Sequence, residues 1–313
     1  MTATHPLDRP KLVASIPFFA AHLAAVPMII ASGWKWEWAL MCVASYYLRM
    51  FGVTAGYHRY FSHRAFQTGR VMQFLLAVLA QSSAQKGALW WAANHRHHHR
   101  YSDQPEDIHS PVQRSLWWSH VGWILSSRYD ATQTHLIRDF ARYPELRFLN
   151  RFHLLPAVLG MVALYALGGL PWLTWGGIVP TVLLWHGTFT INSLSHVFGK
   201  RRYLTTDDSK NNLLLALITC GEGWHNNHHF HHNTANQGWF WWEVDFTFYA
   251  LRALEAVGLV WKLRLPPEAT RMAHTRYSEA QKALLAQQNG EAPRRDTPAG
   301  GLAAPMPAPV MKR

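Results

Sequence analysis

The chain has 313 residues and a formal net charge of +12, and 49% of its residues are hydrophobic. This length suits one domain or slightly more. The basic residues are not gathered in one arm and match no nucleic-acid-binding signature, which argues against nucleic acid as a partner. The only cysteines, Cys42 and Cys220, do not suggest a disulfide framework. Beside apolar stretches, the positive charge is typical of cytosolic loops near anionic lipid.

Two apolar stretches near the N-terminus predict membrane-spanning helices. After a polar tail at residues 1–11, residues 12–32 are long and apolar enough to cross a bilayer, and they lack a signal-peptide cleavage site. A short aromatic connector leads to a second predicted span at residues 38–57. Arg49 lies inside that span, where a charge needs protein or water around it. This hairpin keeps both of its ends on one side of the membrane.

The middle of the chain is polar. Residues 71–91 are amphipathic and predict a helix lying along the interface or capping a site. From His95 to Arg151 the chain is too charged to lie in lipid, and its excess of Lys and Arg places it in the cytosol.

Residues 154–170 and 172–197 predict a second hairpin of spans that turns at Gly168-Gly-Leu-Pro171. The expected fold is therefore an all-α integral membrane protein with four transmembrane helices in two hairpins and a cytosolic helical cap, over residues 12–262. Residues 263–313 form a C-terminal extension that we expect to be disordered from about residue 287. Both termini then lie in the cytosol.

Histidines gather in four places beside the apolar stretches. On a helix, residues i, i+3 and i+4 share a face, whereas neighbours diverge by about 100° and can serve two different metals. Nine imidazoles without a cysteine exceed a tetrahedral zinc site and favour two metals with room for oxygen. The nine are His58, His63, His95, His98, His99, His196, His225, His228 and His229.

Other interpretations of these histidines stay open. A single set of three histidines at positions i, i+3 and i+4 is compatible with a solvated, basic stretch of helix. A metal transporter or sensor would need ligands deep in the spans, lining a path across the membrane. Asp103, Asp107 and Glu222 suit carboxylate partners that orient histidine rings, and equally suit surface ion pairs or caps.

The motifs His-Arg-Tyr-Phe-Ser-His, His-Arg-His-His-His-Arg-Tyr-Ser, Asn-Ser-Leu-Ser-His and Gly-Glu-Gly-Trp-His-Asn-Asn-His-His resemble the boxes of the membrane fatty acyl desaturases. The most similar branch is the stearoyl-CoA (Δ9) desaturases, in a bacterial form, and the similarity covers about residues 12–262. The resemblance implies that the nine histidines bind two iron ions, and that Asn192 reaches one iron through water.

The resemblance also implies the reaction. An O2-dependent enzyme would introduce a cis double bond, at Δ9, into a saturated C16 or C18 acyl chain in a bacterial inner membrane. Acyl-CoA is the preferred carrier, ahead of acyl carrier protein and phospholipid. A separate electron donor is required, either a ferredoxin or a cytochrome b5-like protein with its reductase. The closest alternative is a membrane fatty acyl or alkane hydroxylase with the same metal chemistry.

Substrate-binding positions follow from the same resemblance. Gln85, Trp91 and Thr188 match the kink of the family's acyl tunnel. Tyr46 and Met50 match its far end, where a bulky Met50 shortens the space and predicts a preference for C16 over longer chains.

One departure bears on the carrier. The Arg-Asp pair that helps animal members hold coenzyme A is replaced by Ala93 and Asn94. Lys86 is the nearby residue that can compensate for this loss.

Overall fold

The computed structural model describes residues 8–291 and is mostly helical, with one antiparallel pairing of β1 and β2. The first half contains α1 (Leu12–Ser32), α2 (Trp36–Phe51), η2 (Gly52–Ser62), β1 (Gln67–Thr68), α3 (Arg70–Gln81), α4 (Ala88–Tyr101), η3 (Trp118–Gly122), α5 (Trp123–Leu125), η4 (Thr134–Leu136), α6 (Arg138–Ala141) and α7 (Pro144–Arg151). The second half contains α8 (Leu155–Trp172), η5 (Leu173–Ile178), α9 (Val179–Ser193), η6 (Leu194–His196), α10 (Leu213–Ile218), α11 (His225–Phe230), α12 (Phe246–Ala256), β2 (Val260–Trp261), α13 (Glu268–Arg271), η7 (Ala273–Arg276) and α14 (Glu279–Gln288).

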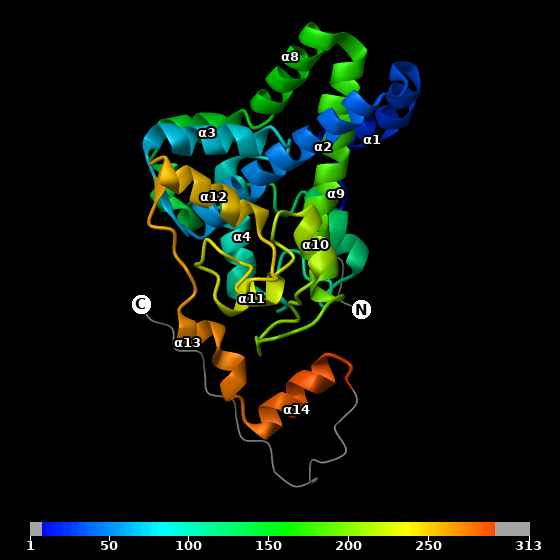
Figure 1. Cartoon of the computed structure of the whole chain (residues 1–313). Coiled ribbons are helices and arrows are strands. Elements are labelled where there is room, and N and C mark those ends of the chain that lie inside the picture. Colours follow the sequence, from blue (N-terminus) through cyan, green and yellow to red (C-terminus); the bar gives the residue numbers. More distant parts are fainter. Residues whose placement is uncertain (1–7, 292–313) are drawn as a thin grey trace.

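Two helical stretches in the described part of the chain are long and apolar enough to cross a membrane, Leu12–Ser32 and Leu155–His196. The second is bent at Gly168 and Gly169, and Gly169 has a φ of 62° that favours glycine. Figure 1 shows α8 and α9 as the two arms of the resulting hairpin, so the predicted turn is confirmed. The predicted span 38–57 is not among the two candidates, because α2 has only 16 residues before the π-helical η2 begins. The four-span topology stays a prediction.

Arg49 has partners that the sequence did not reveal. Its guanidinium donates to the hydroxyl of Thr181 and the carbonyl of Gly177, and its Nε donates to the carbonyl of Ser45. The buried charge is therefore solvated by protein oxygens and joins α2 to the η5–α9 arm.

The core of the cap forms around η2, all of whose residues are buried. Tyr57 and Phe61 are among the largest fully buried side chains, and α3 and α4 pack against this segment. Figure 1 shows α4 and α11 below the long helices, with α12 to one side. The cap thus surrounds the π-helical end of the α2 arm.

The predicted single helix over residues 71–91 is wrong, because it is interrupted between α3 and α4. The hydroxyls of Ser82 and Ser83 donate to carbonyls three residues back, which competes with helix propagation. Ala84 and Lys86 then adopt positive φ values of 56° and 70°. Gly87 is required where it stands, because a Cβ there would lie 2.2 Å from the Asn150 side-chain oxygen.

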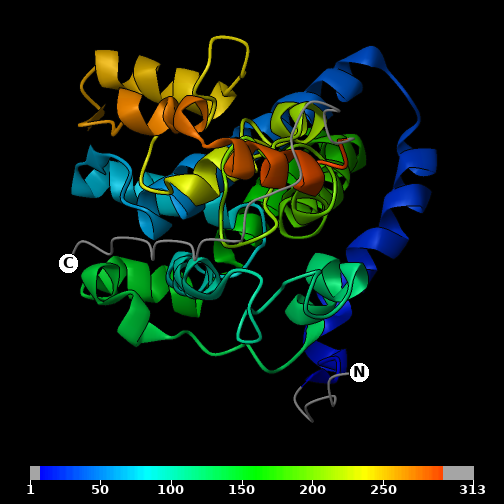
Figure 2. The same cartoon turned by 90° about the horizontal axis from the view of Figure 1, so that it is seen from below.

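The C-terminal extension begins with defined structure. The side chain of Asn289 accepts from the amide of Arg201 (2.7 Å) and donates to its carbonyl (2.9 Å). Figure 2, which views the molecule from below, shows α14 lying over the yellow-green part of the chain. The prediction of disorder from about residue 287 concerns mainly residues 292–313, which lie outside the described part of the chain. Residues 1–7 of the predicted N-terminal tail also lie outside it.

Candidate metal centre and adjoining cavity

The structure brings the nine predicted histidines together in two groups whose ring nitrogens lie within 4.8 Å of one another. The five-histidine group contains His58, His63, His95, His99 and His228. The four-histidine group contains His98, His196, His225 and His229.

The π-helical geometry of η2 explains how His58 and His63 reach one group. In an α-helix, residues five apart diverge by about 140°. A π-helix instead bonds residues i and i+5, and the amide of His63 donates to the carbonyl of His58 (3.2 Å). This backbone bond places both rings on the same side of the segment. The spacing alone did not predict a π-helix.

Helices α4 and α11 divide their triplets in opposite ways. On α4, the i and i+4 residues His95 and His99 belong to the five-histidine group, and His98 belongs to the other. On α11, His225 and His229 belong to the four-histidine group, and His228 crosses over. The predicted divergence of His98 and His99 toward two sites is confirmed.

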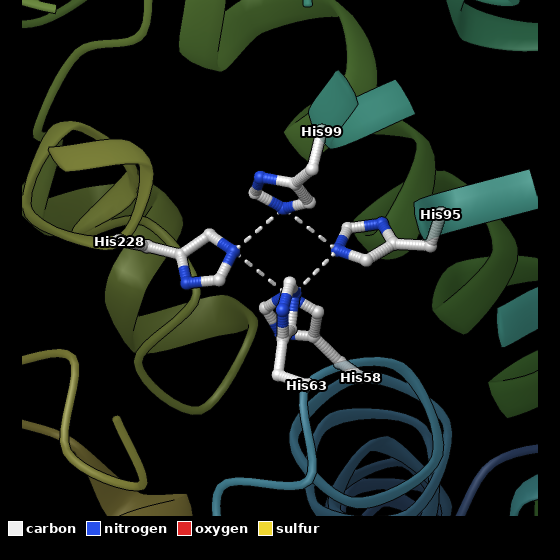
Figure 3. A group of neighbouring side chains, drawn as sticks. All are labelled: His58, His63, His95, His99 and His228. Carbon is white, nitrogen blue, oxygen red and sulfur yellow. Dashed lines mark hydrogen bonds between the residues drawn. The ribbon is translucent and has the colours of Figure 1, made fainter. Parts of the chain in front are cut away.

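The Nε2 atoms of the five-histidine group form a chain of close contacts. Figure 3 shows its five rings pointing toward a common centre. The contacts run from His58 through His228, His99 and His95 to His63, at 3.0, 2.9, 3.0 and 2.9 Å. A ring nitrogen offers one hydrogen or one lone pair along a single direction. The Nε2 atoms of His228, His99 and His95, which each contact two other rings, therefore cannot form both contacts as hydrogen bonds. A cation at the centre would accept all five lone pairs.

The spacing of the nitrogens also fits a metal. Two nitrogens each about 2.1 Å from one ion and about 90° apart are separated by about 3.0 Å, which matches these contacts and the 3.1 Å between the Nε2 atoms of His196 and His225. Burial, and then the neighbouring rings, lower the pKa of His63, His95 and His228 well below its ordinary value. The rings are therefore neutral and keep the lone pairs that a metal needs.

Three carboxylates orient the four-histidine group. The Nδ1 atoms of His98, His196 and His229 donate to Asp107 (2.9 Å), Asp103 (2.8 Å) and Asp207 (2.6 Å), respectively. Since a carboxylate only accepts, each Nδ1 carries the hydrogen and each Nε2 keeps its lone pair. The Nε2 of His229 is buried without a hydrogen-bond partner among the described residues, as expected for a ligand atom.

Among the described residues, the five-histidine group has one carboxylate partner, Glu222, which contacts the Nδ1 of His58. Glu222 also accepts from the fully buried guanidinium of Arg59 (3.0 Å), which donates in turn to Asp245 (2.9 Å). Burial opposes ionisation of Glu222, but its interactions with His58 and Arg59 lower its pKa overall. Glu222 therefore belongs both to the histidine group and to a buried ion network of the fold.

Sequence reasoning proposed Asp103, Asp107 and Glu222 as ring partners but missed Asp207. Asp207 lies 22 residues before His229, in a loop with no periodic pattern. Its neighbour Asp208 offers the same local signal but pairs with Arg201 instead. Only the folded chain distinguishes the two.

A cavity of about 600 Å³ adjoins the histidines. Its lining includes His95 and the predicted substrate-binding residues Gln85, Lys86, Trp91 and Thr188, together with Asn192.

The predicted kink residues meet at this wall. The Gln85 amide donates to the Thr188 hydroxyl (3.1 Å). Tyr46 and Met50 are not among the lining residues; they lie against Gly187, next to Thr188. Asn192 is anchored through its carbonyl, which accepts from the Ser119 hydroxyl (2.6 Å).

Three further histidines form a hydrogen-bonded chain outside the two groups. His22 contacts the carbonyl of Phe18, and its Nε2 lies 3.0 Å from that of His186, whose Nδ1 lies 2.9 Å from His120. Because His186 uses both ring nitrogens in this chain, hydrogen bonding accounts for the positions of His22 and His186 better than metal binding does.

Comparison with known proteins identifies the class. The model of the fatty acid desaturase family matches residues 34–261, and the chain belongs to this family. It is 36% identical to the sn-1 stearoyl-lipid 9-desaturase of Synechocystis sp. over 88% of each chain. It is 34% identical to the sn-2 palmitoyl-lipid 9-desaturase of Nostoc sp., over 77% of this chain and 87% of that one. The icosanoyl-CoA 5-desaturase of Limnanthes douglasii is 32% identical over 82% of this chain and 72% of its own length.

Proposed function

We propose that this fatty acid desaturase introduces a cis double bond at Δ9 of a saturated C16 or C18 acyl chain, using O2. The observation that carries the proposal is the convergence of nine imidazoles in two adjoining groups, one of which reaches an apolar cavity through His95. The names of the cyanobacterial relatives support the Δ9 position, whereas other relatives are named 5- and 7-desaturases.

The residues present fit two iron ions, one held by the five-histidine group and the other by the four-histidine group, with Asn192 contributing through water. When bound, the irons would supply the activation of O2 that side chains cannot provide. The overall reaction consumes one O2, two electrons and two protons, removes two vicinal hydrogens from the chain and releases two waters. The protein's share is to orient the rings through Nδ1, to hold the acyl chain and to keep the site dry.

The electrons must come from a separate donor, a ferredoxin or a cytochrome b5-like protein with its reductase. We place residues 12–262 as a membrane domain with four spans in two hairpins, in a bacterial inner membrane, with the histidines and both termini in the cytosol. Two of these spans correspond to α8 and α9, the two arms of the hairpin, and one corresponds to α1. The alternation of spans and polar segments supports this orientation.

The acyl chain is proposed to bend at Gln85, Trp91 and Thr188, and to extend toward Tyr46 and Met50. Met50 is 1% exposed and lies against Gly187, next to Thr188, where it would limit the length of the chain. We therefore expect faster turnover of C16 than of C18 chains. Met50→Ala should raise the C18 to C16 product ratio, and C18 turnover equal to that of C16 in the unaltered protein would contradict the assignment.

The rival function is hydroxylation by the same kind of centre. The test is expression in a desaturase-deficient host, followed by gas chromatography–mass spectrometry of fatty acids with derivatised double bonds. A cis-Δ9 monoene that disappears in His98→Ala supports the proposal. A hydroxylated product would show instead that the protein is a hydroxylase. A metal transporter is disfavoured because all nine histidines converge on two adjoining groups rather than along a path.

A further inference from the structure

The cavity beside the histidines opens toward the surface of the apolar helices. Its walls include residues of α1 and of α8 that are themselves exposed, such as Val13 (81%), Val158 (53%) and Val162 (60%). These residues lie on the two stretches that are apolar enough to cross a membrane. If those helices are embedded as proposed above, the cavity opens into the bilayer between them.

Two lysines stand at the polar end of the same cavity. Lys11, at the start of α1, and Lys86 both line it, and both donate to one carboxylate oxygen of Asp130, at 2.7 and 2.6 Å. Asp130 is 43% exposed. Two ammonium groups share a single, half-exposed carboxylate, so the cluster carries one uncompensated positive charge.

The backbone is strained where it presents Lys86. Ala84 and Lys86 both have positive φ values, which side chains other than glycine rarely adopt. The Tyr57 hydroxyl holds the carbonyl of Lys86 (2.7 Å), and the indole of Trp185 holds that of Ser83 (2.8 Å). The surroundings therefore fix a costly conformation that directs Gln85 to Thr188 and Lys86 to the cavity, as is common at ligand sites.

From these observations, and on the basis of the proposed desaturase function, we propose that the substrate is an acyl chain of a membrane phospholipid. The chain enters sideways between α1 and α8, and the lipid phosphate binds Lys11 and Lys86 in place of Asp130. A lipid phosphate can replace the carboxylate of Asp130 for two reasons. It accepts charge-assisted hydrogen bonds from both ammonium groups. It also lies in the headgroup layer of the bilayer, where lysines are common at the ends of membrane-spanning helices. This replaces acyl-CoA as the preferred carrier.

The test uses the full chain in lipid nanodiscs that contain a phosphatidylglycerol with a photoreactive diazirine in its acyl chain. Mass spectrometry should locate the label on cavity residues of α1 and α8. Lys11→Ala with Lys86→Ala should reduce labelling about tenfold or more, the loss expected for a charge-assisted contact. The matched control is Lys282→Ala, a lysine of α14 that is paired with Glu279.

Asp130→Asn separates a ligand site from a purely structural ion pair. Removal of the competing carboxylate should increase labelling, whereas a structural role predicts a decrease or no change. Val158→Trp should obstruct the opening and abolish labelling of the cavity. Leu159→Trp is its control, because Leu159 is similarly exposed (58%) but does not line the cavity.

Labelling that is insensitive to the lysine pair, or that palmitoyl-CoA displaces as well as phosphatidylglycerol does, would overturn the lipid site. A cis-monoene formed from palmitoyl-CoA but not from phospholipid would also overturn it, while leaving the desaturase function intact. Lysine-dependent labelling of an iron-loaded protein that makes no unsaturated product from either substrate would instead support the lipid site and refute the desaturase function.

Discussion

The two histidine groups share the helices α4 and α11, yet their surroundings differ. Three of the four rings in the four-histidine group donate to aspartates. In the five-histidine group one ring meets a carboxylate, and that carboxylate also neutralises a buried arginine. A donated hydrogen bond to a carboxylate raises the basicity of the opposite ring nitrogen. The difference makes the two candidate metal sites inequivalent, with the more electron-rich rings around the site that has one histidine fewer.

The largest expected effect comes from removing one ring from each group. His98→Ala and His228→Ala should each lower desaturation by more than about 100-fold, because losing an outer partner alone costs about 10- to 100-fold. Metal content per chain, measured by inductively coupled plasma mass spectrometry, should fall in both. His97→Ala is the control, since His97 faces the carbonyl of Glu106. Full metal content in either variant would remove that ring from the ligand set.

The second prediction concerns Arg59 and the contribution of its buried ion pairs to the stability of the fold. Arg59→Met leaves Glu222 and Asp245 buried without their cation, which should cost about 3–5 kcal/mol of stability. Thermal unfolding in detergent measures this loss. Arg252→Met removes the arginine of an exposed pair with Glu255 and should cost less than about 1 kcal/mol. Equal melting temperatures for the two variants would show that the buried network of Arg59, Glu222 and Asp245 does not stabilise the fold.

The third prediction concerns the aspartates. Asp207→Asn should weaken metal binding at the four-histidine group about 10- to 100-fold with little change in stability, because the ring of His229 loses its orientation and basicity. Titration with ferrous iron, followed by Mössbauer spectroscopy, should show one of two signals changed. Asp208→Asn is the neighbouring control. A change in both signals would contradict the separation of the two groups.

The smallest effect is expected at Gln237. Its amide lies 3.3 and 3.4 Å from the Nδ1 atoms of His58 and His228, where the other group has carboxylates. Gln237→Leu should lower metal affinity at the five-histidine group by less than about tenfold, as befits weak, uncharged contacts. A loss as large as that in Asp207→Asn would mean that the two groups are supported equally.

The sequence predicted the gathering of the histidines better than the residues that support them. The i, i+3, i+4 spacing placed His95, His98 and His99 correctly, because α-helical geometry is local. The π-helix at His58 and His63 was missed, because its extra residue per turn is stabilised by burial within the cap.

Contacts between distant segments were equally hidden. Asp207 acquires its role only when the loop after α9 folds against α11, and the break at Ala84 depends on Tyr57 and Trp185 holding a strained backbone. Helix periodicity carries no information about such partners. The Gly168 turn, by contrast, was visible because glycine and proline mark it in the chain itself.

The crossing of His228 into the five-histidine group has a consequence for biosynthesis. His58 and His228 meet across 170 positions of the chain, which a ribosome needs roughly ten to thirty seconds to add at 5–20 residues per second. The segment η2, which carries His58, must therefore wait without its partner until nearly three quarters of the protein has been made. Neither group can be completed on the nascent chain before α11 emerges, so a metal that requires every ring of a group could bind only after this point in synthesis.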